Sequence, residues 1–264
     1  MTTRPLALLL LCAATAAAQR APDFRWEKAL AAGSTVSLHN LNGDVSVTPS
    51  TSGKVEIVGV KHASGRDAED LTLEVVETSR GITVCSMFAR ADMECDEDGF
   101  HVHDRGRGWR DHDWDDASID IEVKLPANLL VNAHSVSGNV SIVGAQGEVR
   151  AASVSGDVRM EQLRVSSLKA TSVSGNVSVG IVALTGSGPL TFTSVSGDVT
   201  AELPRTIDAD VTMRSVSGSL DSEFPLTLNG RVNRHSLEAR IGKGGRELEV
   251  RTVSGDVRLR QTKQ

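Results

Sequence analysis

Apolar and polar residues alternate along most of this chain. The alternation begins at Val36 and Leu38 and continues through Val45 and Val47. A period of two, rich in Val, Ile and Thr, is typical of strands with one buried face. No amphipathic helix of convincing length is found, and Pro and Gly recur at intervals that would interrupt one. The pattern therefore predicts an all-β protein.

A short motif recurs within this alternation. Ser-Val-Ser-Gly-Asp-Val at residues 153–158 returns with small changes, and its other copies lie at 135–140, 172–177, 194–199, 215–220 and 252–257, with a weaker one at 40–45. From Gly138 to Gly218 the motif glycines are 18, 19, 22 and 21 residues apart. A period near twenty is typical of stacked repeats. Gly255 follows 37 residues later, so we expect a degraded copy at residues 237–242.

Each repeat has two alternating arms around the motif glycine. Val131 and Ala133 precede one such glycine, and Val140 and Ile142 follow it. The two apolar sets are out of phase along a straight strand, so a bend must re-aim the second arm. Gly permits a positive φ, and Asp or Asn bonds its own backbone at such turns. The motif thus predicts structural corners at Gly43, Gly138, Gly156, Gly175, Gly197, Gly218 and Gly255.

Coils built in this way would stack about 4.8 Å apart and pair each strand with its equivalent in the next coil. The predicted fold is a single-stranded parallel β-helix, a β-solenoid, with 18–22 residues per coil. An in-register stack disfavours like charges side by side. The corner column satisfies this rule as far as residue 219, because it reads Asn139, Asp157, Asn176, Asp198 and Ser219, with Asp256 last.

Three further columns follow from the repeat. Serines at the positions of Ser135 and Ser137 are expected to form hydroxyl ladders. The valines between them, beginning with Val136, are expected to turn into the core at the corner. The alternative is an exposed valine stripe that contacts a partner.

The first 18 residues are expected to be a signal peptide. Arg4 is followed by an apolar run over residues 5–14 and by a small-residue cleavage site at 16–18. The run is too short to span a membrane, and no later stretch approaches spanning length. Cys12 follows Leu11, whereas a lipidation site requires a small residue there. We therefore expect an exported protein, located in the periplasm, on the outer-membrane surface or outside the cell.

The mature chain is expected to begin with a lead-in and to continue as one domain. Residues 19–34 are interpreted as an irregular lead-in or N-terminal cap, with Phe24 and Trp26 as anchors. Repeat folds need such a cap. Residues 35–264 are predicted to form the solenoid domain, and an acidic insertion interrupts it at about 86–117.

Two cysteines remain after the signal peptide. In an oxidising compartment Cys85 and Cys95 are expected to form a disulfide. Closing a loop of about ten residues stabilises a fold by roughly 2–3 kcal/mol in the entropic description. The competing interpretation is a pair of metal thiolates, although no other cysteine accompanies them.

The insertion carries the candidate chemistry. Residues 92–116 contain ten acids, three of the seven histidines and two of the three tryptophans, without apolar periodicity. Imidazole and carboxylate groups bind Zn²⁺ and other divalent ions. The candidate ligands are His101, His103, His112 and Asp113. One hypothesis is that residues 90–116 bind a divalent metal or a polysaccharide. The alternative is a solvated charged loop, with Trp109 and Trp114 packed on the rod.

Composition excludes several classes of function. A net charge of −6 argues against nucleic acid or an anionic membrane as a partner. Aromatic residues make up 3% of the chain, and sugar grooves and interaction hot spots usually depend on them, so the composition does not indicate a rich recognition surface. Serine recurs in every repeat, which indicates structure and not a nucleophile, and the Gly-rich residues 242–245 lack phosphate-loop spacing. We expect no cofactor and no enzymatic activity. An enzyme acting on envelope polysaccharide is less favoured.

The repeats resemble those of the bacterial putative-adhesin family, exported β-strand-repeat proteins of unknown function. The resemblance covers residues 35–264, and residues 224–257 are similar to that family's ending. It implies a solenoid like an autotransporter adhesin head. We therefore expect a non-catalytic envelope scaffold or binding module, adhesin-like, whose partner is a surface protein or polysaccharide. Its ends, unless capped, would favour self-association.

Overall fold

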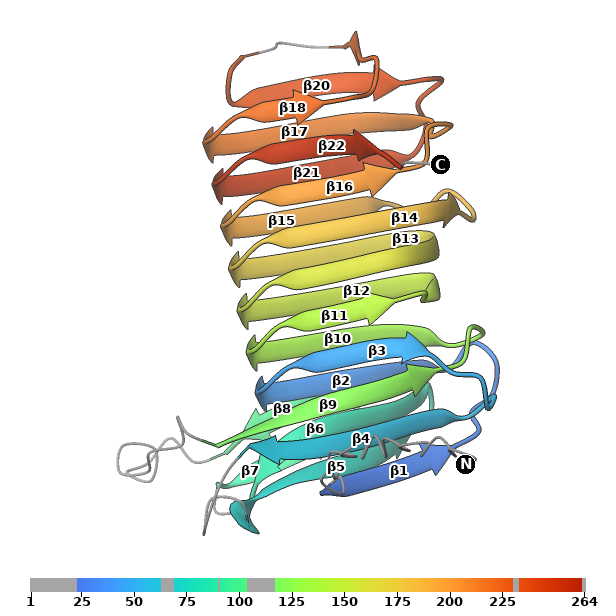
Figure 1. Ribbon diagram of the computed structural model, residues 1–264, viewed down its shortest axis with the longest axis vertical. Coiled ribbons are helices and arrows are strands. Elements are labelled where there is room, and N and C mark those ends of the chain that lie inside the picture. The colour runs from blue at the N-terminus through green and yellow to red at the C-terminus, as the bar shows by residue number, and fades with distance from the viewer. Residues whose placement is uncertain (1–22, 63–68, 90, 104–116, 230–232, 263–264) are drawn as a thin grey trace, which may run out of the picture.

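The computed structural model describes residues 23–62, 69–89, 91–103, 117–229 and 233–262. Within these ranges the strands of a 20-stranded sheet are stacked like rungs along one long axis (Figure 1). A two-stranded sheet lies beside one end of the stack. Most strand pairs of the large sheet are parallel, as in the pairings of β10 with β12 and of β14 with β16. The predicted all-β fold with mostly parallel strands is confirmed.

The middle of the stack winds in the order of the sequence. Equivalent strands of successive coils pair in parallel, so that Val131 lies beside Val149, and Val140 beside Val158. The strands of this region are β10 (Leu130–Ser137), β11 (Val140–Val143), β12 (Gln146–Ser155), β13 (Val158–Ser174), β14 (Val177–Leu184), β15 (Leu190–Ser196) and β16 (Val199–Leu203).

The C-terminal end departs from sequence order. The last coil, β21 (Glu247–Ser254) and β22 (Val257–Gln261), pairs on one side with β15 and β16. On its other side it pairs with the earlier strands β17 (Ala209–Ser217) and β18 (Leu220–Ser222). The final coil therefore lies between two coils that precede it in the chain.

The expected degraded copy at residues 237–242 does not form a coil of the parallel series. Strand β20 (Ser236–Ile241) runs antiparallel to β17, and β19 (Thr227–Leu228) runs antiparallel to β20. The prediction is wrong because the chain reverses direction before residue 236. The alternating apolar residues of β20, which suggested a coil, serve instead to cover the end of the core, with Ala239 and Ile241 buried.

The N-terminal end is also built out of sequence order. The coil of β2 (Thr35–Asn42) and β3 (Val45–Pro49) lies between β10–β11 on one side and β6 (Gly81–Phe88) with β9 (Ser118–Leu125) on the other. Antiparallel strands complete this end, with β4 (Val55–His62) on β9 and β5 (Leu71–Thr78) on β6.

The segment before the first coil is not irregular throughout, contrary to expectation. Its strand β1 (Phe24–Lys28) pairs antiparallel with β4. Phe24 and Trp26 are partly buried and pack against the core, as the sequence predicts. Two aromatic residues at spacing two are consistent with a strand that packs one face, and this is the signal that the irregular interpretation overlooked.

The corners re-aim the second arm of each repeat as predicted. Val131 and Ala133 before a corner and Val140 and Ile142 after it are all buried in one continuous core. Burying a valine or isoleucine side chain contributes roughly 1.5–3 kcal/mol relative to leaving it exposed. Because each coil repeats this burial, hydrophobic packing is distributed along the whole stack.

The corner glycines are required mainly by close stacking of the coils. A Cβ atom on Gly175 would collide with the carbonyl oxygen of Gly156, and one on Gly156 with that of Gly138. Gly43, Gly138 and Gly255 also have φ angles of 118°, 156° and 146°. The other four corner glycines lie outside that positive range. The predicted requirement for positive φ therefore holds for part of the column, and backbone proximity explains all of it.

The corner Asp and Asn side chains join each coil to the next. The carboxylate of Asp157 accepts a hydrogen bond from the backbone N–H of Asn176 at 2.7 Å. The Asn176 side chain in turn accepts one from the backbone N–H of Asp198 at 2.9 Å. The Asn176 amide also donates to Asp157, at 3.3 Å. Asn between two Asp thus supplies a donor and avoids charge repulsion.

Two coils, β2–β3 and β21–β22, lie out of sequence order in the stack. Each of them brings a pair of corner aspartates together, which the order of the motifs along the sequence did not predict. Asp198 and Asp256 are neighbours, because the Asp256 N–H donates to the Asp198 carboxylate at 2.8 Å. Arg258 forms ion pairs with both carboxylates. Asp44 and Asp120 are joined in the same way, and His62 lies 2.7 Å from the Asp120 carboxylate. Each Asp–Asp step therefore has a basic side chain beside it.

The first serine column is buried and does not form a hydroxyl ladder. The Ser172 hydroxyl donates to the Gly156 carbonyl at 2.8 Å, and Ser194 donates to Gly175 at the same distance. Thr252 occupies the equivalent position in the last coil and donates to Gly197. The expectation of hydroxyl–hydroxyl contacts is wrong, because the corner carbonyl of the adjacent coil lies closer and needs a donor.

The valines of the motif point outward, contrary to expectation. Val173 is 41% exposed, and Val216 at the C-terminal end is 67% exposed. The alternation of the first arm continues up to the corner, so the residue after buried Ser172 faces solvent. The exposed valine stripe, the alternative interpretation, is the arrangement found. In spatial order it consists of Val136, Val154, Val173, Val195, Val253 and Val216.

The insertion contains an ordered hairpin on the outer face of β6. Strands β7 (Met93–Asp96) and β8 (Gly99–Val102) pair antiparallel, and the Cys85–Cys95 disulfide, confirmed here, joins the hairpin to β6. Met87 and the two cysteines are buried in a small second cluster under the hairpin. These residues of the insertion therefore form regular structure although they lack the apolar periodicity of the repeat. Residues 104–116 lie outside the described part of the chain.

Candidate functional site

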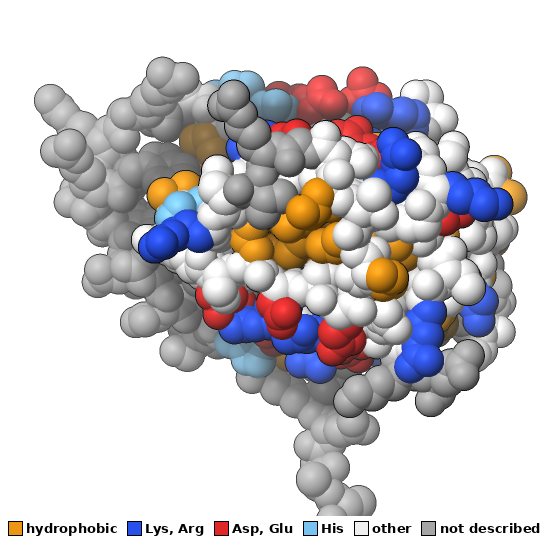
Figure 2. Space-filling view, turned by 90° about the horizontal axis from the view of Figure 1, so that it is seen from above, with side chains coloured by type: hydrophobic (Ala, Val, Ile, Leu, Met, Phe, Trp, Pro, Cys, Tyr) orange, Lys and Arg blue, Asp and Glu red, His pale blue; other side chains and the backbone are white. Residues whose placement is uncertain are grey.

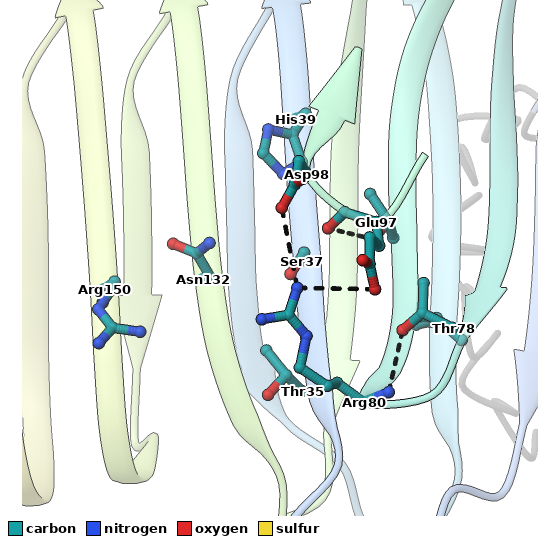
Figure 3. Close-up of a pocket in the computed structure, with 11 residues that line it drawn as sticks. Thr35, Ser37, His39, Thr78, Arg80, Glu97, Asp98, Asn132 and Arg150 are labelled. Atoms are coloured by element: carbon teal, nitrogen blue, oxygen red, sulfur yellow. Dashed lines mark hydrogen bonds and ion pairs between the residues drawn. The ribbon is translucent and has the colours of Figure 1, made fainter. Parts of the chain in front are cut away.

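A hollow of about 210 Å³ lies beside the hairpin, on the outer face of the sheet (Figure 3). Its floor includes Ser37 from β2, Asn132 from β10 and Arg150 from β12. These side chains point outward because each follows and precedes a buried residue of its strand. The parallel register places Asn132 beside Ser37 and Arg150 beside Asn132. The other lining residues are Thr35, His39, Thr78, Arg80, Ile82, Thr83, Glu97 and Asp98.

The walls of the hollow come from two turns. Arg80 follows β5, and its Nη2 atom lies 3.8 Å from Glu97 Oε2 and 3.8 Å from Asp98 Oδ1. Both distances exceed hydrogen-bond length, so the guanidinium keeps N–H donors for a ligand. Glu97 and Asp98 form the hairpin turn. Gly99 of that turn packs against the imidazole of His39, where a Cβ atom would collide with the ring.

Two stacked histidines lie beside the hollow. The rings of His39 and His134 are nearly parallel, with centroids 5.2 Å apart. Burial, and then the adjacent His134, lower the pKa of His39 to about 4. Burial is also the largest cause that lowers the pKa of His134, followed by Lys169 and Arg150. Both rings are therefore neutral near pH 7.

Two of the four predicted metal ligands are described. His101 and His103 lie on β8 and its end, where His101 Nε2 is 3.0 Å from Asp96 Oδ2 and His103 Nε2 is 3.1 Å from Glu94 Oε2. His112 and Asp113 lie outside the described residues. Among the residues that the structure describes, no group of three or more His, Cys, Asp or Glu is arranged to hold a metal ion. Metal binding by the four residues stays a prediction.

A more apolar groove of about 400 Å³ lies where the valine stripe reaches the C-terminal end. Val195, Val253 and Val216 contribute its apolar surface, and Arg214 and Arg251 lie at its rim. Both arginines have partners, since Arg214 pairs with Glu238 and Arg251 with Glu249. The groove is therefore a widened part of the valine stripe, and both of its arginines already have a carboxylate partner.

The C-terminal end of the stack exposes apolar side chains. Figure 2 looks onto this end, where hydrophobic side chains gather near the centre and charged side chains lie along the flanks. Leu228 is 56% exposed, and Leu220, Leu226 and Leu237 are partly buried against the core. Strand β18 pairs with β22 alone within the described residues, so one of its edges is open.

Sequence reasoning missed the hollow. Ser37, Arg80, Asp98, Asn132 and Arg150 are separated by tens of residues and meet only through the order of the coils. Aligning the first arms of the repeats would have placed Ser37, Asn132 and Arg150 in one column. The height of the walls would still have been missed, because it depends on the hairpin.

Residues 34–260 match the family described as Toastrack DUF4097. None of the curated proteins matches the sequence. Within the described ranges, no helix is long and apolar enough to cross a membrane.

Two solved structures are similar to the chain. One is a putative cell adhesion protein from Clostridium sporogenes, with 9% identity and a TM-score of 0.43 over 90% of this chain and 99% of that one. The other is a putative adhesin from Bacteroides fragilis, with 11% identity and a TM-score of 0.40 over 90% of this chain and 96% of that one. The family match alone covers more than three quarters of the sequence, so the chain belongs to the Toastrack DUF4097 family.

Proposed function

We propose that this protein is an exported, non-catalytic binding module of the cell envelope, adhesin-like and built on a β-solenoid over residues 35–264. In this proposal residues 1–18 are a signal peptide, and the mature protein is located in the periplasm, on the outer-membrane surface or outside the cell. The partner is a surface protein or a polysaccharide. The proposal assigns no cofactor.

The observation that carries the proposal is the use of the recurring polar residues. Corner Asp and Asn side chains accept backbone hydrogen bonds from the next coil, and buried Ser side chains donate to corner carbonyls. A residue whose polar atoms are occupied in this way is not free to act as a nucleophile or general base. The repeat is thus a scaffold, which leaves the outer surfaces for binding.

Two further features support an exported binding module. The Cys85–Cys95 disulfide is typical of proteins in oxidising compartments. The valine stripe exposes apolar side chains in register along the corner edge, and exposed apolar surface often marks contact with a partner.

Deletion of the gene and complementation with the wild type test the proposal. We expect the deletion strain to attach less well to its surface or to partner cells, and fractionation to place the protein outside the cytoplasm. Unchanged attachment together with a cytoplasmic location would contradict it. The alternative hypothesis is an enzyme that acts on envelope polysaccharide. It would be supported if the purified protein turned over such a polysaccharide and replacement of one acidic residue abolished that turnover.

Metal or polysaccharide binding through residues 90–116 is a second candidate function. The observation that favours it is the pairing of His101 with Asp96 and of His103 with Glu94 on one hairpin. Calorimetry with Zn²⁺, Cu²⁺ and Ca²⁺ on the wild type and on the His101/His103/His112→Ala variant tests it. Heat of binding that the triple variant retains in full would exclude these histidines as ligands.

We also propose that copies associate through the solenoid ends. An open edge on β18 and the exposed side chain of Leu228 support this, because unpaired strand edges readily pair with another chain. Light scattering after size-exclusion chromatography should show a dimer that Leu228→Asp abolishes. Val182→Asp, which also changes an exposed apolar side chain, is the matched control. A monomer at all concentrations would contradict the proposal.

A further inference from the structure

We propose that the hollow between Arg80 and Arg150 binds one neutral saccharide unit. This inference rests on the proposed function as a binding module, and it assigns to that function a specific site and a class of ligand. The site lies where the hairpin β7–β8 rises above the outer face of β2, β10 and β12 (Figure 3).

The charges around the hollow favour a neutral ligand. Arg80 and Arg150 are balanced by Glu97 and Asp98, and the neighbouring His39 is neutral. Arg150 also forms an ion pair with Glu148, which further reduces the positive charge available to an anion. Phosphate or another multiply charged anion would meet the Glu97 and Asp98 carboxylates, and a cation would meet the two guanidinium groups.

The polar groups suit hydroxyl groups, which need donors and acceptors side by side. Arg80 and the Asn132 amide offer N–H donors, while Asp98 offers carboxylate acceptors. The Asn132 Oδ1 atom already lies 2.7 Å from His134 Nε2, which fixes the amide with its N–H groups toward the hollow. Within the described part of the chain, the hydroxyl groups of Thr35 and Ser37 form no hydrogen bond. A sugar hydroxyl can both donate and accept a hydrogen bond, so it can replace the hydrogen bonds of a water molecule that it displaces from these groups. A simple ion cannot do both.

The size and shape of the hollow limit the ligand to a single ring. Its volume of about 210 Å³ is below the 300–1,000 Å³ range typical of sites for drug-sized molecules. A longer polysaccharide would therefore present one unit to the hollow and continue across the sheet.

The hairpin makes this position unlike the rest of the sheet. The row that begins with Ser37, Asn132 and Arg150 continues through Lys169, Thr191 and Glu249 on later coils. Only the first part of the row has lining residues contributed by the hairpin turn, among the residues that the structure describes. The disulfide joins the hairpin to β6 two residues from both Thr83 and Glu97, which holds the wall in place before a ligand binds.

Nuclear magnetic resonance titration of the oxidised full chain tests the inference. The probes are glucose, galactose, mannose and N-acetylglucosamine, with glucuronate and inorganic phosphate as charged comparisons. We expect at least one neutral sugar to bind with a Kd on the order of 1 mM. The Ser37→Ala/Asn132→Ala double variant and Arg80→Met should each weaken binding by at least about tenfold. The control is Lys169→Ala/Thr191→Ala, at the same register on coils without the hairpin, and it should bind like the wild type.

Several outcomes would overturn the inference. These are no binding of any of the four neutral sugars, binding of only glucuronate or phosphate, or equal loss in the control variant. A midpoint of urea unfolding equal to that of the wild type shows that each variant is folded. If attachment depends on the gene but no sugar binds, this inference fails and the proposed function stands. If a sugar binds but gene deletion leaves attachment unchanged and the protein is located in the cytoplasm, the proposed function fails and the site stands.

Discussion

The corner edge of the stack and the hollow beside the hairpin contain similar residue types and use them differently. At the corners, Asp157 and Ser172 are engaged in hydrogen bonds that join one coil to the next. In the hollow, Ser37 and Asp98 are held by the fold with polar atoms facing solvent, and Arg80 lies beyond hydrogen-bond distance of its acidic neighbours. The corner residues recur in every coil, whereas the hollow occurs where a hairpin interrupts the repeat.

This difference teaches that recurrence and function are separable in the chain. A motif that recurs at the backbone spacing of stacked strands stabilises the stack, because each copy needs its neighbour to complete its hydrogen bonds. A binding site needs groups that the neighbour does not use. The comparison predicts that corner changes will lower stability, and that changes in the hollow will lower binding and leave stability unchanged.

Substitution of a corner glycine is expected to have the largest effect on stability. Gly175→Ala should lower the free energy of unfolding by at least about 3 kcal/mol, since its Cβ would collide with a backbone carbonyl that cannot move alone. Gly180→Ala is the control, because its Cβ would lie no closer than 3.7 Å to its neighbours. Urea unfolding measures both. Equal effects at the two positions would show that close stacking does not explain the corner glycines.

Removal of the disulfide should destabilise the hairpin β7–β8 and leave the stacked coils unchanged. Cys85→Ala/Cys95→Ala should cost roughly 2–3 kcal/mol, since the bond closes a loop with a sequence separation of 10. Hydrogen exchange should increase at residues 93–102 and stay unchanged at the corners of β12 to β16. An increase spread evenly over the molecule would mean that the hairpin and the coils unfold together.

Acid should weaken the region beside the hollow through His39. Its pKa is about 4 in the folded protein and 6.5 for the free group, so below pH 6.5 the unfolded state takes up the proton first. Stability should be constant above pH 6.5 and fall by on the order of 2 kcal/mol towards pH 4. His39→Gln should flatten this fall in part, leaving the contribution of His134, while His235→Gln at an exposed position should not. An unchanged slope in His39→Gln would contradict the account.

The smallest expected effect on stability is that of removing the Arg258 ion pairs in the last coil, β21–β22. The backbone N–H of Asp256, and then the Arg258 guanidinium, hold the pKa of Asp198 below its ordinary value. Arg258→Met should therefore destabilise by less than about 1 kcal/mol, as is typical of exposed ion pairs. The deficit should disappear as pH falls through the pKa of Asp198 and its charge is lost. Adding Asp256→Asn should restore stability, since it recreates an Asp–Asn step. A further loss in the double variant would contradict charge repulsion as the cause.

Much of the fold could be predicted from local pattern. The alternating arms around Gly138 and Gly156, the corners and the Cys85–Cys95 bond all follow from residues close in sequence. The order of coils could not, because nearly identical motifs can stack in several orders. That order decides which corner residues meet, so the contact of Asp198 with Asp256 and the need for Arg258 were both outside the reach of the motif.

The sequence indicated which segment would contribute to the candidate site, but not which residues of the coils would join it. The insertion was identified as the break in the repeat, and its hairpin provides Glu97 and Asp98. The floor could not be predicted, since Ser37 and Asn132 meet through the parallel pairing of β2 and β10, whose members are far apart in sequence. The outward direction of Val136 and its equivalents was misjudged, because the position of the bend within the motif cannot be read from alternation alone.

The most direct test of the central claim, that the repeat is scaffold and the interruption is the site, is chemical-shift mapping of the folded wild type with the neutral sugars. The account predicts that amide signals shift at residues 35–39, 78–83, 97–99, 132 and 150, around the hollow. It predicts no change at the corners from Gly138 to Gly255. Shifts that follow the corners and the valine stripe, or spectra that no sugar alters, would contradict it.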